Sequence, residues 1–426
     1  MRLRRIVQAL LVTLALLAVA LVYSRATRSA DLRVYYYVSR VLLDHQGQLY
    51  GPLSGIGWPQ YFRYPPVFLL AFLPFALLPY KAAAAAWAAL KCAVLYALAC
   101  ALGRRLDFPR TGFWWLVPVL LCGGFVTQEF GLGNAQFLVF ALVAASLLSL
   151  EANSSRSAFL LAFATSLKVW PLFFLPIIAA RRRARVAALT LILITGFMLL
   201  PAAYFGWGDN LRLVRQWIAQ EWGTGSLGVS TWFPSQSLSG VLQRYLTTMD
   251  YSKWPDPNYH QLHLLHMDPR LVTWISALLA AGAYLGLLWL VRKTPATRES
   301  QPRLLLSEAL AFCALPLLEP VSHRIAFVVL LWPAMVAGLL LTAPGFPSPR
   351  SKLLICAAVA IEAVEPLIAG AKAQRLFQVV GVDFWATCIL TAGLLRAWME
   401  WQRKQNAQRS SQGLPLPMSY EVGAGR

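Results

Sequence analysis

Long apolar runs separated by short arginine-rich clusters are the feature that most constrains the fold of this 426-residue chain. Several runs approach the roughly 20 residues that an α-helix needs to cross a bilayer. Hydrophobic residues are 58% of the sequence and charged residues only 13%, whereas about 25% of the residues of a typical globular protein are charged. We therefore predict an all-α polytopic membrane protein, in which residues 1–400 form a single transmembrane domain and residues 401–426 a disordered cytoplasmic tail.

The basic clusters predict the topology. Lys and Arg gather in the cytoplasmic loops of membrane proteins, so we place every cluster inside, and the number of crossings between neighbouring clusters must then be even. The clusters lie at residues 2–5, 104–110, 181–185, 292–303, 350–352 and 403–409. This pattern, together with attraction to anionic lipid headgroups, explains the net charge of +20 better than nucleic-acid binding does.

The even count predicts about twelve spans, with both termini inside. Residues 6–22 are interpreted as a retained anchor rather than a cleaved signal peptide, because the residues that follow are bulky and basic. Residues 158–178 must turn back as a hairpin with Lys168 near its outer tip, which also avoids the cost of a lysine in mid-membrane. Residues 66–79 are too short to cross, and we predict a helix in the outer interface. The remaining predicted spans are 82–102, 113–125, 137–150, 186–205, 271–291, 304–318, 325–341, 353–369 and 379–397.

Asp31 is the first candidate for chemistry. It follows the first predicted span in an outer loop of residues 23–64, which we expect to contain interfacial helices; a second long outer loop covers residues 206–270. A carboxylate crowded by aromatic side chains at a membrane surface can act as a general base toward a hydroxyl. Asp31 also opens a helical pattern, and aspartate is a favoured N-cap. The residues alone leave both interpretations open.

Several arginines lie on the outer face in this topology, against the positive-inside trend. Arginine binds phosphate through a planar fork of donors, so one or two of them could hold a phosphorylated lipid headgroup. The alternative is contact with ordinary anionic lipid. Arg63 is the best candidate, because the surrounding Phe-Arg-Tyr-Pro-Pro sequence fixes it where the chain re-enters the membrane. The set is Arg25, Arg28, Arg33, Arg40 and Arg63.

Amides and histidines complete the polar residues of the outer side. Asn134 and Gln136 open a predicted span, and Gln236 lies in the second outer loop; such amides can bind a sugar hydroxyl or cap exposed backbone. His323 stands between two spans, beside an arginine. The histidines at 260, 263 and 266 are spaced by three, but no HExxH motif or cysteine partner accompanies them, which disfavours zinc. The sequence also lacks a P-loop, GxGxxG and GxSxG, which disfavours a nucleotide-driven pump or a serine hydrolase.

An ordered set of motifs over residues 31–334 resembles the bacterial polyprenol-phosphate-mannose-dependent mannosyltransferases, glycosyltransferase family 87 or DUF2029, which have the membrane-embedded GT-C architecture. No single motif is specific, and the resemblance rests on their order. The amides at 134 and 136 appear as Asn then Gln, where many relatives show Gln first, and the last motif lacks the family's usual Trp and paired histidines. The motifs are Asp31 with Tyr35 and Tyr36, Leu49-Tyr50, residues 62–66, residues 77–79, Trp87, residues 133–136, residues 168–171, residues 236–238 and residues 320–323.

The resemblance implies a reaction. A sugar, mannose by family default, passes with inversion from a polyprenyl phosphate in the outer leaflet to a hydroxyl of a lipid or glycan acceptor. Asp31 then becomes the base; one carboxylate suffices because the phosphate departs without an acid, unlike the two-carboxylate hydrolases. His323 becomes a second catalytic candidate. Arg63, Lys168 and Arg324 become ligands of the donor phosphate. Candidates for contacting the sugar or the acceptor are Tyr35, Tyr64, Asn134, Gln136 and Gln236.

The same resemblance implies the location and the partners. We expect a multi-pass protein of the bacterial inner membrane, with its active site on the periplasmic or extracellular side. No cofactor and no divalent metal are expected, because the acid pair of many GT-C enzymes is absent at Asp31. The alternative is a transporter or flippase of lipid-linked saccharides, which predicts internal repeats and polar residues spread along the spans. The sequence shows neither, so the enzyme is preferred.

Overall fold

The computed structural model describes residues 30–44, 48–51, 61–105, 113–223, 234–248, 262–294, 301–365 and 370–411. Every regular element in these ranges is a helix, which confirms the predicted all-α class. The predicted anchor at residues 6–22 lies outside the described residues, as do Arg25, Arg28 and His260.

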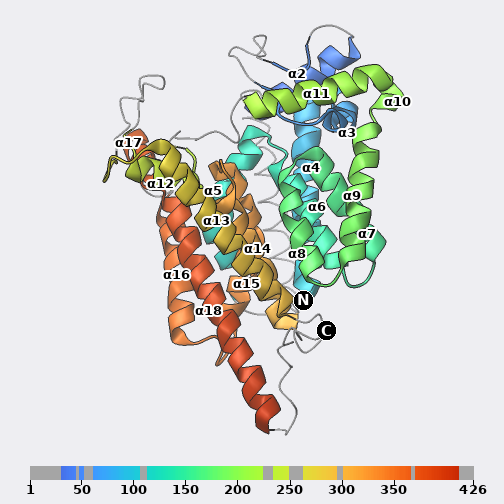
Figure 1. The fold of residues 1–426 in the computed structure, drawn as a ribbon. Coiled ribbons are helices and arrows are strands. Elements are labelled where there is room, and N and C mark those ends of the chain that lie inside the picture. The colour runs from blue at the N-terminus through green and yellow to red at the C-terminus, as the bar shows by residue number, and fades with distance from the viewer. Residues whose placement is uncertain are drawn as a thin grey trace, which may run out of the picture.

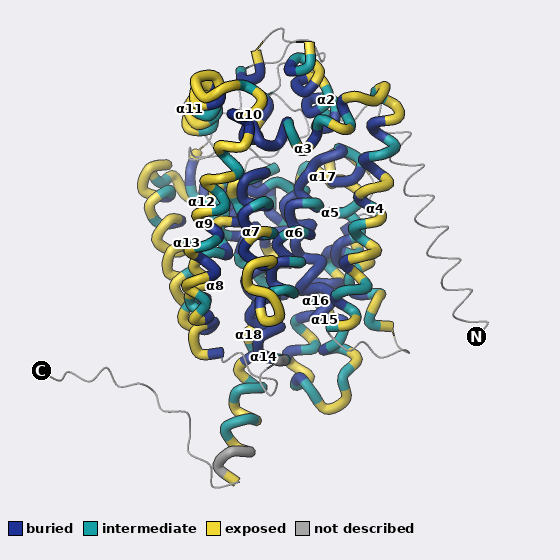
Figure 2. The backbone as a smooth tube through the Cα atoms, turned by 90° about the vertical axis from the view of Figure 1, so that its right-hand side faces the viewer, coloured by how far each residue is buried: buried dark blue, intermediate teal, exposed yellow. Residues whose placement is uncertain are grey.

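The helices form an elongated bundle whose two chain halves lie side by side (Figure 1). Helix α5 (Leu116–Leu132) belongs to the first half of the chain, yet it packs against α15 (Leu331–Thr342) and α16 (Pro349–Val364) of the second half. The turn that follows α5 therefore leads from one half to the other. Buried residues fill the middle of the bundle, and exposed residues line its outer helices (Figure 2).

Four described segments are long and apolar enough to cross a membrane. A bent pair, α17 (Ala371–Val380) with α18 (Val382–Ser411), adds a fifth if it counts as one span. Each falls within a few residues of a predicted span, whereas the total of about twelve remains a prediction. The four are α4 (Tyr80–Arg105), α9 (Ala184–Leu199) with α10 (Ala202–Phe205), α13 (Pro269–Arg292), and the 3₁₀ helix η4 (Arg324–Leu330) with α15.

The predicted reversal at Lys168 is confirmed. Lys168 ends α7 (Ser154–Leu167) in an extended conformation, with φ −153° and ψ 139°. Its Nζ donates to Gln136 Oε1 at 2.6 Å, at the start of α6 (Gln136–Ser149). At the far end of α6, Glu151 pairs with Arg183. The chain therefore rises through α7, turns at Lys168, and descends through η2 (Trp170–Phe173) and α8 (Phe174–Ala180).

The basic clusters around Arg105 and Arg181 lie at the opposite end of the bundle from the helix that carries Asp31. Glu308 of α14 (Gln301–Leu318) pairs with Arg181 at 2.9 Å and with Arg105 at 3.5 Å, so these basic clusters share one end of the bundle. Helices α2 (Ala30–Leu43), α3 (Pro66–Ala76) and α11 (Trp207–Gly223) lie at the opposite end (Figure 1). The short helices α12 (Leu238–Leu246) and α17 lie at that end too. This separation agrees with the predicted topology.

Aromatic side chains fasten α2 to the bundle. Tyr35 of α2 meets Phe68 of α3 with ring centroids 4.9 Å apart, and Phe72 meets Trp87 of α4 at 5.2 Å. All four rings are buried. Edge-to-face pairs of this kind stabilise by about 0.5–1.5 kcal/mol beyond the area they bury. They fix the start of α2, and with it Asp31, above α4.

The prediction of disorder from residue 401 is wrong for residues 401–411, which continue α18. Trp401 packs against Phe346 with ring centroids 5.3 Å apart, and Lys404 Nζ donates to the carbonyl of Gly345 at 3.4 Å. These contacts stabilise a polar segment whose composition alone suggested a tail. Residues 412–426 lie outside the described ranges.

The buried Glu308 network gives a prediction about stability. Replacing Glu308 by Gln would leave Arg181, whose side chain is 2% exposed, and Arg105 without a counterion. We expect a loss of about 3–5 kcal/mol, because an unpaired buried charge is costly. Glu151→Gln is the control: its pair with Arg183 is about one-third exposed, which predicts a loss of about 0–1 kcal/mol. Thermal unfolding in detergent compares the two, and equal losses would contradict the prediction.

Candidate active site

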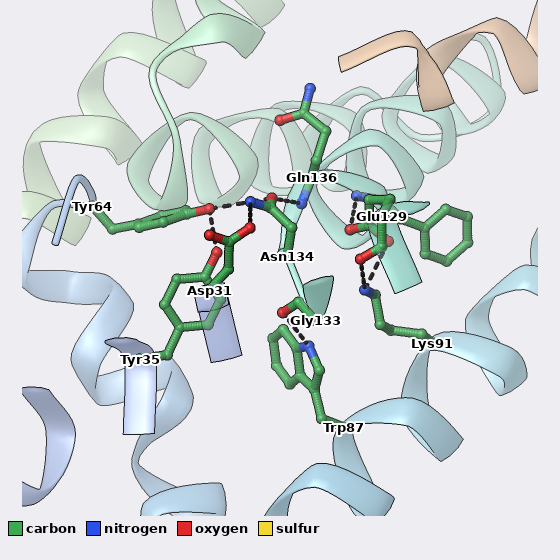
Figure 3. Close-up of polar contacts among 10 residues, drawn as sticks. Asp31, Tyr35, Tyr64, Trp87, Lys91, Glu129, Gly133, Asn134 and Gln136 are labelled. Atoms are coloured by element: carbon green, nitrogen blue, oxygen red, sulfur yellow. Dashed lines mark hydrogen bonds and ion pairs between the residues drawn. The ribbon is translucent and has the colours of Figure 1, made fainter. Parts of the chain in front are cut away.

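Asp31 lies in the first turn of α2 and binds a residue from another part of the fold (Figure 3). Asn134 Nδ2 donates to Asp31 Oδ2 at 2.8 Å, across 103 residues of sequence. The positive end of the α2 dipole also favours a carboxylate here. The side chain therefore joins a tertiary site, and this arrangement favours the interpretation of Asp31 as a functional group over a purely local N-cap.

The turn between α5 and α6 orients Asn134. Gly133 caps α5 in the left-handed conformation with φ 65°, which strains any residue with a side chain. Asn134 Oδ1 accepts from the backbone N–H of Gln136 at 2.8 Å. Because a backbone N–H can only donate, the amide oxygen must face α6 and the amide nitrogen must face Asp31. Asn134 thus both caps α6 and binds the carboxylate.

Two buried tyrosines lie beside Asp31 and Asn134. Tyr35 and Tyr64 share a hydrogen bond of 2.6 Å between their hydroxyls, and Tyr64 donates to Asn134 Oδ1 at 3.4 Å (Figure 3). Burial raises the pKa of both phenols well above the usual value. They are therefore neutral at physiological pH and can serve as hydrogen-bond partners but not as bases.

The surroundings of Asp31 act on its proton affinity in both directions. Burial raises the pKa of Asp31, and it outweighs the hydrogen bond from Asn134 and the charges of Lys168 and Lys91, which lower it. A carboxylate with a raised pKa has a higher proton affinity than a solvated one.

Cationic groups lie beside the carboxylate. Lys168 Nζ donates to Gln136 and stands 5.6 Å from the centre of the Tyr64 ring, and its charge interacts with the carboxylates of Glu319 and Asp31. Burial, followed by the charges of Lys168 and Arg63, lowers the pKa of His323 to about 4. The imidazole is thus neutral near pH 7 and lies close to two cations.

Arg63 lies near His323, at the partly exposed edge of the site. It pairs with Glu221 of α11 at 3.5 Å, and its side chain is 48% exposed. Trp217 of α11 donates to the Arg63 carbonyl at 3.3 Å, which holds the segment under that helix.

Two predicted site residues lie apart from this group. The Arg324 guanidinium binds both carboxylate oxygens of Glu365, within a buried cluster that includes Glu362 and Asp383, where oxygens lie within 4.8 Å of one another. His323 is extended and directly precedes η4, in which Arg324 is the first residue.

Gln236 is likewise outside the group and has a supporting position. Its backbone N–H donates to the carbonyl of Ser322 at 2.6 Å, and its side chain donates to the carbonyl of Gln378 at 2.8 Å. Gln236 thus holds the segment that carries His323.

An ion pair that was not predicted from the sequence lies beneath the turn between α5 and α6. Lys91 of α4 and Glu129 of α5 pair at 2.7 Å, and both side chains are fully buried (Figure 3). The signal that could have found them is one lysine and one glutamate inside neighbouring apolar helices, where an unpaired charge is costly. Trp87, one turn before Lys91, donates to the Gly133 carbonyl at 3.0 Å.

An apolar groove adjoins the cationic groups. It has a volume of about 370 Å³ and lies between η2, α13 and α14. Glu319 and Val169, a neighbour of Lys168, line one part of it, and Tyr284 lines it farther along α13. The groove is open on the side where Val169 and Leu172 are exposed. An apolar groove of this kind suits an apolar ligand or the tail of a lipid.

An apolar helical bundle with a carboxylate, amides, cations and an apolar groove at one end has the features of a membrane-embedded glycosyltransferase. The sequence model of glycosyltransferase family 87 matches residues 62–307, more than half of the chain, and the protein belongs to this family. Comparison with curated proteins and with solved structures found no match. The matched region contains Arg63, Asn134 and Lys168, whereas Asp31 and His323 lie outside it.

The raised pKa of Asp31 predicts an effect on stability. A carboxyl whose pKa is higher in the folded than in the unfolded state costs stability once pH exceeds the ordinary value of 3.8. We therefore expect Asp31→Asn to raise the unfolding temperature at pH 7, and the gain to shrink as pH falls toward 3.8. Asp44→Asn, in an exposed pair with Arg40 on the same helix, is the control and should bring no gain. Lower stability of Asp31→Asn at pH 7 would contradict the expectation.

Proposed function

We propose that the protein transfers a sugar, mannose by analogy with the family default, from a polyprenyl phosphate to a hydroxyl of a lipid or glycan acceptor, with inversion. The observation that carries the proposal is the pairing of Asp31 with Asn134 beside Lys168. A carboxylate beside a cation is what an inverting transfer from a phosphate needs, and this supports the proposal.

Asp31 is proposed as the base. Among the described residues, Asn134 donates a hydrogen bond to Oδ2 of Asp31, which leaves Oδ1 to accept a proton. The acceptor oxygen attacks the anomeric carbon, the bond from that carbon to the phosphate oxygen breaks, and the phosphate leaves with the electron pair. The acceptor's proton passes to Asp31. A hydroxyl next to a carboxylate of raised proton affinity becomes a stronger nucleophile as this proton is transferred.

Lys168 and Arg63 are proposed to bind the donor phosphate. Negative charge grows on the phosphate as the bond to the sugar breaks, and fixed cations stabilise that charge in the transition state. His323 is neutral in this position, so it is proposed to contribute a hydrogen bond rather than a full charge. Arg324, neutralised by Glu365, is not included in the proposed phosphate site.

The groove beside Lys168 supports a lipid-borne donor. Its apolar walls can cover several isoprene units, and Val169 in its lining directly follows Lys168, the proposed ligand of the phosphate. Because the basic clusters mark the opposite end of the bundle, we infer that the site faces the periplasm in a bacterial inner membrane. The neighbours of Asp31 are amides, phenols and cations rather than further carboxylates, so no divalent metal is proposed there.

The role of Asp31 can be tested directly. Asp31→Asn and Asp31→Ala should abolish transfer from labelled polyprenyl-phosphate mannose to membrane acceptors, because no other described carboxylate binds Asn134. Asp44→Asn should keep wild-type activity, since Asp44 pairs only with Arg40 among the described residues. Full activity of Asp31→Asn in folded protein would remove Asp31 as the base.

The role of Lys168 predicts a different kinetic result. Lys168→Met should lower kcat/KM for the donor by about 10–100-fold, because a hydrogen bond to a charged group is worth about 1.5–3 kcal/mol. The KM for the acceptor should change little. Lys293→Met is the control, since Lys293 stacks on Trp289 at the basic end of α13. An unchanged donor kcat/KM in Lys168→Met would exclude Lys168 from the phosphate site.

A further inference from the structure

The ion pair between Lys91 and Glu129 has no part in the mechanism above. Both side chains are fully buried, and Lys91 Nζ lies 2.7 Å from Glu129 Oε2. Lys91 also donates to the Glu129 carbonyl at 3.3 Å, and its Nζ stands 4.6 Å from the centre of the Phe130 ring. Buried ion pairs of this kind are often no more stabilising than a well-packed apolar pair. Stability alone therefore does not account for this one.

Glu129 binds both arms of the turn that presents Asn134. Its Oε1 accepts from the backbone N–H of Phe137 at 3.0 Å, and its backbone carbonyl accepts from the N–H of Asn134 at 3.2 Å. Phe137 lies on α6 and Glu129 on α5, so the carboxylate links the two helices across the turn (Figure 3). A shift of Glu129 would move Asn134.

Helix α4 holds the turn from below. Trp87 and Lys91 are four residues apart and share one face of α4. Trp87 binds the carbonyl of Gly133, and Lys91 binds Glu129. These two contacts hold the turn at Gly133, the glycine in the left-handed conformation, and at Glu129, four residues before it. The direction of the Asn134 amide therefore depends on α4.

Lys91 also acts on Asp31 through its charge, in the direction that favours the ionised carboxylate. Several titratable or charged groups face Asp31 from the elements around it, and Lys91 and Lys168 are the cations among those described. The groups are Tyr35 of α2, Tyr64 before α3, Lys91 of α4 and Lys168 after α7.

We propose that Lys91 and Glu129 are positioning residues, which hold Asn134 against Asp31 and set the electrostatic surroundings of the base. This inference rests on the proposed function. Neither residue touches substrate: Glu129 acts through the turn, and Lys91 acts through Glu129 and through space. The pair would thus give the Asp31 carboxylate both a fixed partner in Asn134 and a nearby positive charge.

Two variants separate position from charge. Lys91→Met with Glu129→Gln removes both charges at similar volume, and with them the contact of Lys91 with Glu129 that holds the turn on α4. We expect kcat to fall about 10–100-fold, as for a misplaced catalytic group. The acid limb of the pH–rate profile should move to higher pH, because Asp31 loses a neighbouring cation. Glu129→Asp keeps the ion pair but withdraws its oxygen from Phe137; we expect a lower kcat with an unshifted acid limb. Donor KM should change little in either variant.

A matched control uses the other buried ion pair. Arg181→Met with Glu308→Gln disturbs packing at the far end of the bundle, so it should lower the unfolding temperature without moving the pH–rate profile. A wild-type kcat and an unshifted profile in Lys91→Met/Glu129→Gln would overturn the proposal. If that variant fails to fold, Glu129→Asp decides: an unchanged kcat there would overturn it as well.

A measurement without turnover separates this inference from the proposed function. Asp31→Asn should raise the unfolding temperature at pH 7 by a larger amount in the Lys91→Met/Glu129→Gln background than in wild type, because the ionised carboxylate has lost a stabilising charge. An equal gain in both backgrounds would contradict the electrostatic part of the proposal. Failure of the proposed function has another signature, which is full transfer activity in Asp31→Asn.

Discussion

The hydrogen bond from Asn134 to Asp31 joins two segments that the sequence separates by 103 residues. Asp31 has to sit at the start of a short helix at the end of the bundle, and Asn134 has to leave a turn between two long helices. The aromatic packing of Tyr35 on α3 and the left-handed glycine before Asn134 bring each partner to its place. The contact orders two side chains at a modest net gain of about 0.5–3 kcal/mol. The contact matters mainly because it fixes the positions of Asp31 and Asn134 relative to each other.

Charged groups inside an apolar bundle must find partners within the protein, and this requirement shapes the packing of the helices. Lys91 with Glu129 joins α4 to α5, and Arg181 with Glu308 joins the end of α8 to α14. Each pair is specific for one alignment of its helices, because a shift by one turn would separate the charges by about 5.4 Å. Apolar contacts alone tolerate such a slip far better.

The sequence was sufficient to predict the apolar helices and the reversal at Lys168. The family resemblance named Tyr64, Asn134 and Lys168 together with Asp31, and these residues lie close to one another, while their roles remain predictions. Hydropathy and basic clusters depend directly on which segments lie in lipid. Lysine and proline are unfavourable inside a span, so together they predict a break in the helix. The partner of Lys91 could not be predicted, because α4 has several possible neighbours. The pairing of Arg324 with Glu365, 41 residues later, could not be predicted because composition does not specify which helices become neighbours. The helical end of α18 depends on the contact of Trp401 with Phe346.

The open side of the groove between η2, α13 and α14 has a kinetic consequence. A long-chain lipid that enters there moves only within the plane of the bilayer and never has to leave it. The rate of encounter then depends on the surface density of that lipid, not on its amount per volume of cell. Dilution of the surrounding membrane with other lipids would slow an enzyme of this shape, even if every aqueous concentration stayed the same.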